Sequence, residues 1–243
     1  MLVELNNNHV KELTKLHQKK YRTLHKKTIV EGVRLIDQLK DYGINFDELI
    51  ISNPDQFDSS QYSAKQILIA NEDQMKKITS TKTPQNIAAV INTIPIPIKE
   101  TQFLLYLDGI SDPGNLGTIF RTATAAGVSG IILSPNCCEV YNPKVIRASL
   151  GSVFYLPSET HDHNWLKSLN TTIIATTLED SINIFELDKP ASLMLVIGSE
   201  AFGVSKEILQ LAKHKVKIPI PGNIESINAA VATGIAIYHF INK

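Results

Sequence analysis

The sequence predicts an α/β protein with two domains, and three observations support this fold class. Short apolar runs alternate with helix-like segments along most of the 243-residue chain, a pattern that indicates parallel strands joined by crossover helices. A proline-containing stretch at residues 92–100 interrupts the pattern, and it favours an extended linker because proline fixes φ and removes a backbone donor. A hydrophobic content of 43% allows one sizeable core or two modest ones. We therefore predict a small α/β domain over residues 1–95 and a parallel-sheet domain over residues 96–243.

The elements of the first domain follow from hydrophobic periodicity and turn residues. We expect helices over residues 9–25, 32–41 and 72–80. We expect strands over residues 28–30, 48–52, 66–70 and 87–91. Together these elements describe an α/β unit that ends before the linker.

The second domain is more regular. Its short runs are apolar throughout, which suits strands that are covered on both faces. We expect strands over residues 103–108, 130–134, 171–177, 193–198 and 215–220. The helical patterns between and after them cover residues 115–126, 144–150, 165–169, 205–213 and 226–240.

Charge is balanced in total but uneven along the chain. With 24 basic and 24 acidic residues, the net charge alone predicts no nucleic-acid partner. Residues 11–27, however, hold seven Lys or Arg side chains against one acid, and such a segment can neutralise phosphates. A solvated helix face explains the same composition equally well. The candidate RNA contacts in this segment are Lys19, Lys20, Arg22 and Lys26, with Tyr21 beside them.

Cysteine usage and the first residues of the chain indicate a reducing compartment. Cys137 and Cys138 are the only cysteines and are adjacent, so they cannot easily close a normal disulfide and offer no CxxC spacing. The N-terminal stretch is polar, unlike a signal peptide, and no apolar run is long enough to span a bilayer. We therefore expect a cytoplasmic protein without a membrane partner. His161 and His163 form an HxH pair, but no Cys or carboxylate set completes a metal site, and we expect no metal.

A first cluster of candidate functional residues follows the expected strand at 103–108. Asp112 stands where a helix N-cap belongs, Pro113 suits the first helical position, and Gly117 allows close backbone approach. Free amides at such a helix start favour an anion, and Arg121 offers a fork of donors suited to phosphate. An ordinary strand–turn–helix with a surface arginine remains the alternative.

Two further clusters are rich in small residues. The run RASLGS at residues 147–152 permits a close backbone approach, although a plain helix C-cap explains it as well. Later, LVIGSEAFG at residues 195–203 ends a strand in a glycine-bounded loop, and IPIPGNIESINAAVATG at residues 218–234 joins a proline-stiffened loop to a helix of small residues. The absence of GxGxxG spacing argues against a Rossmann dehydrogenase.

In this order and at these separations, the clusters resemble the SpoU (TrmH) family of SPOUT methyltransferases. The matching stretches are DPGNLGTIFRTA, RASLGS, IGSEAFG and IPIPGNIESINAAVATG, which together span about residues 102–241. The first hundred residues, on the basic segment and KKTIVEGVRLIDQL, resemble the substrate-binding domain that many members carry in front. The resemblance implies a homodimer and a deep trefoil knot, a feature that composition and periodicity cannot reveal.

The resemblance also implies the activity, which is methylation of a ribose 2′-hydroxyl in structured RNA with S-adenosylmethionine as donor. Carried over position by position, the donor site consists of Thr176, Gly198, Glu200, Ile218, Ile220, Ile227 and Ala229. The polar active-site set consists of Asn115, Arg121, Glu200, Ser226 and Asn228, all present here. Ile227 stands where leucine is commoner and Ile220 where methionine is, both apolar changes of similar volume.

The role of Arg121 and the identity of the RNA stay open. A guanidinium is normally always protonated, so we expect Arg121 to position a phosphate and the hydroxyl, with base action as the stronger alternative. Ribosomal RNA is favoured over transfer RNA because the N-terminal domain resembles a ribosomal-protein-like RNA-binding module. The rival is a non-catalytic RNA-binding or ribosome-assembly factor, which would be expected to have lost Asn115, Arg121 or Glu200.

Overall fold

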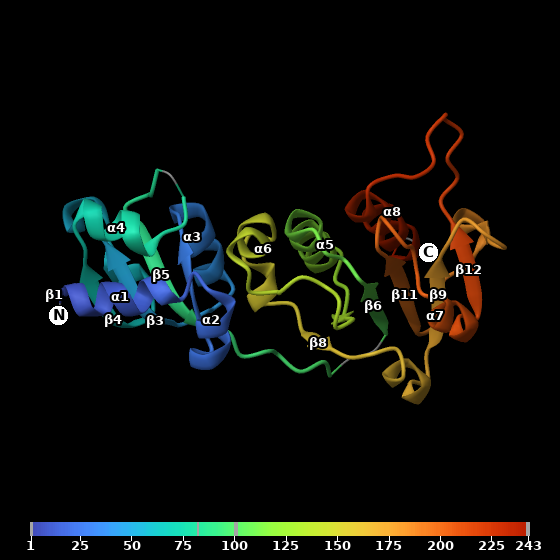
Figure 1. Cartoon of the computed structure of the whole chain (residues 1–243), viewed down its shortest axis with the longest axis horizontal. Coiled ribbons are helices and arrows are strands. Elements are labelled where there is room, and N and C mark those ends of the chain that lie inside the picture. The colour runs from blue at the N-terminus through green and yellow to red at the C-terminus, as the bar shows by residue number, and fades with distance from the viewer. Residues whose placement is uncertain (1, 82, 100–101, 242–243) are drawn as a thin grey trace.

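The computed structural model describes residues 2–81, 83–99 and 102–241 and contains two β-sheets that follow one another along the longest axis (Figure 1). The first sheet has five strands and the second has seven. Between them, residues 93–99 form neither helix nor strand. This link is held at both ends, because Thr93 N–H donates to Lys26 O at 2.9 Å and Ile98 N–H donates to Glu159 Oε1 at 3.1 Å.

The first sheet is mixed, with the strand order β1-β4-β3-β5-β2. Its strands are β1 (Leu2–Glu4), β2 (Lys27–Glu31), β3 (Phe46–Ile51), β4 (Ala64–Ile69) and β5 (Ile87–Asn92). Its helices are α1 (Asn7–Lys15), α2 (Lys19–His25), α3 (Val33–Asp41) and α4 (Glu72–Ile78). Strands β1, β4 and β3 are parallel, whereas β5 is antiparallel to both β3 and β2. Apolar side chains of α1 and α4 pack on one face of the sheet, and those of α3 pack on the other.

The helix predicted over residues 9–25 is two helices. The chain breaks at residues 16–18, where Gln18 adopts an extended conformation instead of a helical one. The carbonyls of Leu16 and His17, released by the break, accept hydrogen bonds from Nη1 of Arg22 at 2.9 and 2.7 Å. The break is therefore stabilised by a side chain from the next helix, which periodicity cannot reveal. Strand β1 was also not predicted, because three residues are too few to establish a period.

The second sheet is parallel throughout, with the strand order β10-β12-β9-β11-β6-β7-β8. Its strands are β6 (Phe103–Asp108), β7 (Gly130–Leu133), β8 (Ser158–Thr160), β9 (Thr172–Thr176), β10 (Ile182–Asn183), β11 (Leu193–Gly198) and β12 (His214–Lys217). Its helices are α5 (Pro113–Ala125), α6 (Pro143–Ala148), α7 (Lys206–Leu211) and α8 (Ala229–Ile241). Helices α5, α6 and α8 pack on one face, and α7 packs on the other. The predicted α/β class with a parallel second sheet is confirmed.

Several boundaries in the second domain differ from prediction. Strands β8 and β10 were not predicted, since both are short edge strands. The helix expected over residues 165–169 is a short 3₁₀-helix, η4 (Trp165–Ser168). Strand β12 stops at Lys217, because prolines follow at positions 219 and 221 and cannot donate to a ladder. The deep trefoil knot is not tested by the strand order and remains a prediction.

The two domains share one continuous apolar cluster. Leu35 and Leu39 of α3 belong to the same cluster of buried side chains as Val145 and Ile146 of α6. Tyr42, after α3, stacks on Tyr155 with ring centroids 4.6 Å apart. Within the described ranges, no helix is long and apolar enough to cross a membrane.

Candidate active site

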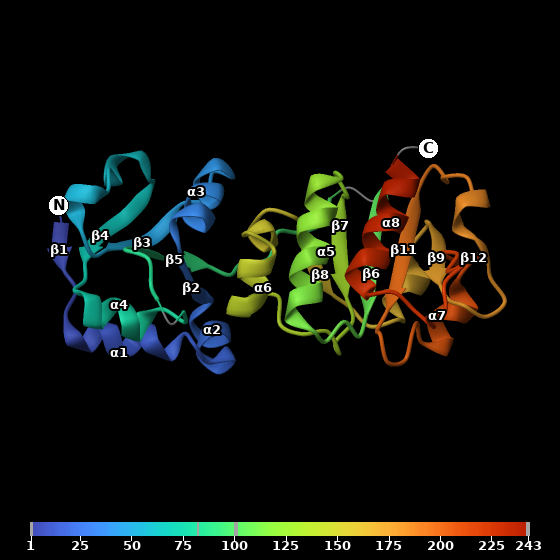
Figure 2. The same ribbon diagram turned by 90° about the horizontal axis from the view of Figure 1, so that it is seen from above.

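The candidate site lies at the carboxyl ends of neighbouring strands in the second sheet. Strands β12, β9, β11 and β6 are adjacent and parallel, so the loops that follow them emerge at the same edge of the sheet, the usual place for a ligand in such folds. Helix α5 follows β6, and α8 follows the long loop after β12. Figure 2 shows α5 and α8 side by side, with α8 next to β11.

Three polar side chains from separate elements meet in a hydrogen-bonded network at this edge. Asn115, in the first turn of α5, donates a hydrogen bond from Nδ2 to Oε1 of Glu200. Its Oδ1 accepts a hydrogen bond from Nδ2 of Asn228 at 2.9 Å. The amide of Asn115 is therefore held at both ends, and it connects α5, the loop after β11 and the start of α8.

Both helix starts at the site are capped by their own side chains. Oδ1 of Asn228 accepts hydrogen bonds from the backbone N–H groups of Ala230 and Val231 at 2.9 and 3.2 Å, which explains why α8 begins at Ala229 and not at the predicted residue 226. In α5, Oδ1 of Asp112 accepts from the N–H of Asn115 at 2.8 Å. This backbone hydrogen bond is the main reason that the pKa of Asp112 lies below its usual value.

The loop that carries Glu200 is a tight turn that only glycine permits. A Cβ built on Gly198 would lie 2.0 Å from the carbonyl carbon of Gly203. Ser199 and Gly203 exchange backbone hydrogen bonds of 3.2 and 2.9 Å, and Gly203 has a φ of 65°. The close return of the chain exposes Glu200 and Phe202 at the tip, and the Phe202 side chain is 91% exposed.

The loop after β12 has the features of a ligand-binding segment. Across the part of the chain that the structure describes, residues 218–227 form no hydrogen bond through backbone or side chain. Ile218, Ile220 and Ile227 are nevertheless half-buried. Backbone donors and acceptors beside partly covered apolar side chains are suited to a ligand with both an apolar body and polar groups. Thr176 ends β9, the strand that pairs with β12, and its Oγ1 donates to Val196 O at 3.0 Å.

Two members of the predicted polar set stand outside the network. Arg121 is exposed on α5, and it forms no hydrogen bond or ion pair with any residue whose placement is described. Ser226 is exposed in the loop before α8 and likewise lacks a described partner. The structure thus joins Asn115, Glu200 and Asn228 directly and leaves the Arg121 guanidinium without a partner among the described residues.

The basic segment divides into exposed and buried cations. Lys19, Lys20 and Lys26 are exposed, and Nζ of Lys20 lies 5.8 Å from the centre of the Tyr21 ring. Arg22, predicted to bind RNA, is instead only 4% exposed. The prediction for Arg22 is corrected, because its guanidinium is occupied within the protein and is not available to a phosphate.

Sequence reasoning missed a cation at the start of α5. Nζ of Lys144, on α6, lies 3.5 Å from Oδ2 of Asp112. The sequence holds no signal for this pair, because the packing of α6 against α5 alone brings the two residues together. Among the described residues, no group of three or more His, Cys, Asp or Glu side chains could hold a metal ion. His161 of the HxH pair instead stacks on Trp165 at 4.4 Å and pairs with Glu159 at 2.7 Å.

Two family models match the chain. The SpoU rRNA Methylase family matches residues 102–238, and the MRM3-like substrate binding domain matches residues 7–89. A curated relative from Bacillus subtilis, 23S rRNA (guanosine(2553)-2'-O)-methyltransferase RlmP, is 32% identical and the alignment covers 96% of each chain. The 23S rRNA (uridine(2479)-2'-O)-methyltransferase of Streptomyces viridochromogenes is 28% identical, over 74% of this chain and 68% of its own.

A solved structure agrees with these sequence matches. The AdoMet-bound rRNA methyltransferase from Sinorhizobium meliloti aligns with a TM-score of 0.86 and 30% identity, covering 98% of this chain and 96% of that one. The parallel sheet, the two matching family models and the AdoMet-bound neighbour together define an α/β methyltransferase with a second domain in front. The chain belongs to the SpoU rRNA methylase family, which confirms the family resemblance of its motifs.

Proposed function

We propose that the protein transfers a methyl group from S-adenosylmethionine to a ribose 2′-hydroxyl of 23S ribosomal RNA. The observation that carries the proposal is the Glu200–Asn115–Asn228 network, formed at the ligand-binding edge of a sheet in a chain that belongs to this family. The full-length similarity to the Bacillus subtilis enzyme supports ribosomal RNA over transfer RNA.

The donor site comprises the loops after β9, β11 and β12 and the first residue of α8. Its predicted members are Thr176, Gly198, Glu200, Ile218, Ile220, Ile227 and Ala229. The free backbone groups of residues 218–227 would bind the polar parts of S-adenosylmethionine, and the half-buried isoleucines would cover its apolar surface. When bound, S-adenosylmethionine supplies the sulfonium methyl that the ribose oxygen attacks.

The chain's own residues position the nucleophile. Arg121 has a free donor fork on the exposed side of α5, which suits a ribose hydroxyl and its neighbouring phosphate. The Glu200 carboxylate, held against Asn115, fixes the loop that faces the reacting groups. Ser226 lies in the loop before α8 and would contact Arg121 or the ribose once RNA is bound. Base action by Arg121 remains the alternative role.

The RNA-binding surface of the first domain consists of Lys19, Lys20 and Lys26. All three are exposed, and together with Tyr21 they present cations beside an aromatic ring, a combination that binds phosphates and stacks on bases. The division of the chain at residues 95 and 96 belongs to the same proposal, since it separates this surface from the methyl-transfer site.

A second copy of the chain would cover α8. This helix is almost entirely apolar, a composition expected for a helix that is buried on all sides. Val231 and Tyr238 nevertheless stay 55% and 45% exposed, and they lie two turns apart on one face. An exposed apolar stripe of this kind indicates a protein–protein interface. We therefore assign the protein as a homodimer, and the free thiols Cys137 and Cys138 fit a reducing cytoplasm.

The decisive experiment is methyl transfer into unmodified 23S ribosomal RNA, with transfer RNA as a parallel substrate. A 2′-O-methylated ribose resists alkaline cleavage, so hydrolysis maps the modified nucleotide. Methylation at one ribose of 23S RNA, lost in Arg121→Ala, is the expected result. Methylation of transfer RNA alone would overturn the choice of substrate. If calorimetry detects no binding of S-adenosylmethionine, the protein is instead a non-catalytic RNA-binding factor.

A further inference from the structure

Arg22 joins the two domains through a buried ion pair. Its Nε and Nη2 donate to the two carboxylate oxygens of Glu139 at 2.9 and 2.5 Å. Glu139 lies in the loop between β7 and α6, and the two side chains are 5% and 16% exposed. This two-pronged pairing restricts distance and orientation together. Because Nη1 also binds Leu16 O and His17 O, the guanidinium is fixed from both sides.

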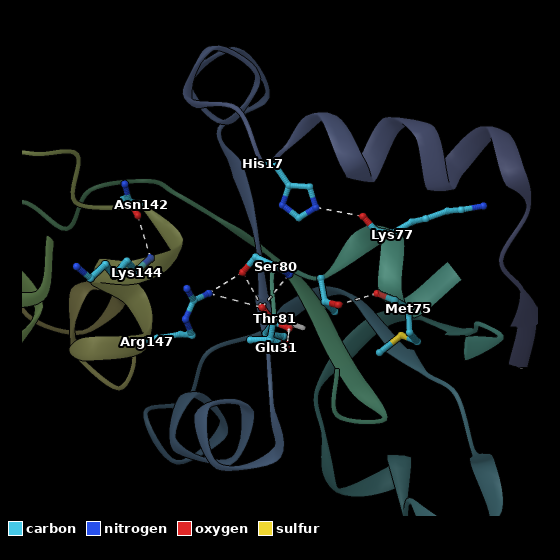
Figure 3. A network of polar contacts seen from close by, with 10 residues as sticks. His17, Glu31, Met75, Lys77, Ser80, Thr81, Asn142, Lys144 and Arg147 are labelled. Carbon is cyan, nitrogen blue, oxygen red and sulfur yellow. Dashed lines mark hydrogen bonds and ion pairs between the residues drawn. The ribbon is translucent and has the colours of Figure 1, made fainter. Parts of the chain in front are cut away.

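Arg147 forms a second connection between the domains (Figure 3). Its Nη1 donates to Oγ of Ser80 at 2.6 Å and lies 3.6 Å from Oε1 of Glu31. The Glu31 side chain is 8% exposed and also accepts hydrogen bonds from Ser80 and Thr81. One carboxylate of the first domain thus organises the loop after α4 and binds an arginine from α6 of the second.

Apolar side chains also pack at this contact between the two domains, which is called the seam below. Gly151 has a φ of 78°, and a Cβ placed there would lie 2.8 Å from Cδ2 of Leu39. Nearby, the rings of Tyr42 and Tyr155 are stacked. The seam therefore contains close packing as well as two arginine–carboxylate contacts, a combination that resists sliding of one domain over the other.

We propose that Arg22 and Arg147 are positioning residues. They set the distance between the lysine surface, formed by Lys19, Lys20 and Lys26 on and directly after α2, and the methyl-transfer site. An RNA held on Lys19, Lys20 and Lys26 then presents one ribose, at a fixed reach, to the edge that carries Asn115. Figure 2 shows α2 toward the same lower edge as the loop that precedes α7. This proposal rests on the proposed function. In it, the contacts between the two domains determine which ribose is methylated.

The position of Arg22 separates this role from direct RNA binding. A phosphate contact requires an exposed guanidinium, whereas Arg22 is 4% exposed and has protein partners for each of its three nitrogens. Glu139 supplies the sharper test. Loss of an acid next to a basic surface should strengthen RNA binding by charge alone, whereas loss of the connection should weaken productive binding. The two effects have opposite signs.

The test compares Glu139→Gln with Glu72→Gln, the same change at an exposed glutamate at the start of α4, outside both the inter-domain contacts and the donor site. We expect Glu139→Gln to raise KM for 23S RNA by about tenfold, to leave the affinity for S-adenosylmethionine unchanged, and to spread methylation to neighbouring riboses. Arg147→Gln, a change at a side chain that is 40% exposed, should spread methylation in the same way without endangering the fold. Small-angle scattering of both variants should show a broader range of domain separations.

Two outcomes would overturn the inference. One is tighter RNA binding with methylation still confined to the wild-type ribose, which would make the seam electrostatic only. The other is lower activity of both variants with methylation still at the wild-type ribose. That result would indicate simple destabilisation, which reduces the amount of active enzyme without changing which ribose is methylated. Wild-type protein in the same assay tests the proposed function separately, because a wild type that methylates no RNA fails before the variants are compared.

Discussion

Asn228 donates a hydrogen bond from Nδ2 to Oδ1 of Asn115 over 2.9 Å, although 113 residues separate them in the chain. This contact decides which way the Asn115 amide points. With Oδ1 occupied, Nδ2 is turned toward Glu200. The start of α8 therefore controls the orientation of a carboxylate in a different loop, at the edge where the methyl transfer is proposed.

Replacing Asn228 by serine tests this relay, meaning the hydrogen bonds from Asn228 to Asn115 and from Asn115 to Glu200. Serine caps a helix about as well as asparagine, so the start of α8 should survive while the donor to Asn115 is lost. We expect kcat to fall by about 100-fold with the melting temperature nearly unchanged. Asn228→Ala should lose the same activity and, in addition, about 1 kcal/mol of stability. Full activity in Asn228→Ser would show that the relay is dispensable.

Gly117→Ala should destabilise the second domain. A Cβ at this position would lie 2.5 Å from Cβ of Ala148 and 2.7 Å from the carbonyl oxygen of Val145, so α5 and α6 would have to separate. Overpacking of this kind costs about 1–3 kcal/mol, measurable by urea unfolding. Thr118→Ala, on the exposed side of the same helix, is the matched control. An equal stability for both variants would contradict the close packing of the two helices.

The pH dependence of stability should involve Asp47. Burial raises the pKa of its carboxyl, but hydrogen bonds from Lys65 and Lys27, at 2.6 and 2.9 Å, outweigh burial and hold the pKa below its usual value. A lowered folded-state pKa adds stability above the unfolded pKa, and the stability is lost as the pH falls through the folded pKa. Asp47→Asn should therefore destabilise at neutral pH and lose this effect as the pH falls below about 3.8.

Urea unfolding of wild type and Asp47→Asn at neutral and acidic pH measures this difference. Asp55→Asn, the same change at an exposed side chain, should unfold like wild type at both. A destabilisation by Asp47→Asn that is equally large in acid would mean that the ion pairs do not carry the effect.

If Lys19, Lys20 and Lys26 bind phosphates, the affinity for RNA should depend on the salt concentration. Each phosphate contact that is removed lowers the slope of log affinity against log salt by about one. The double variant Lys19→Ala and Lys20→Ala should bind 23S RNA more weakly and with a smaller slope, while donor binding stays the same. Lys213→Ala, an exposed lysine at the amino end of β12, should leave the slope unchanged. A wild-type slope in the double variant would remove these lysines from the RNA surface.

Tyr238→Glu should produce monomers. The substitution places a charge on the exposed face of α8, where the proposed partner copy packs, and an unpaired buried charge opposes association. Sedimentation at several concentrations measures the change. Leu24→Glu serves as control, because Leu24 is a hydrophobic residue that is 66% exposed on the first domain. Monomeric wild type, or a dimeric Tyr238→Glu variant, would contradict the α8 interface.

Local signals predicted much of the fold. Asp112 and Pro113 mark the start of α5 because an N-cap and a first-turn proline act within one turn of backbone. The strand at 103–108 has the predicted bounds, since a fully apolar run between polar turns needs no distant partner to be recognised. Short edge strands such as β10 (Ile182–Asn183) were not predicted, because two residues show no hydrophobic period and only pairing with β12 makes them a strand.

The sequence by itself determined the family, the α/β class and the types of side chain at the site. Motif order and hydrophobic period can be recognised from the linear order of the residues alone. Only the tertiary structure decided which of those residues act together. Arg22 has the composition of an RNA contact, yet folding buries it against Glu139, 117 positions away. Asn115 and Asn228 likewise meet only because the sheet places β6 beside β11 and α8 beside α5. Burial and partner choice depend on long-range packing, for which the linear sequence carries no local signal.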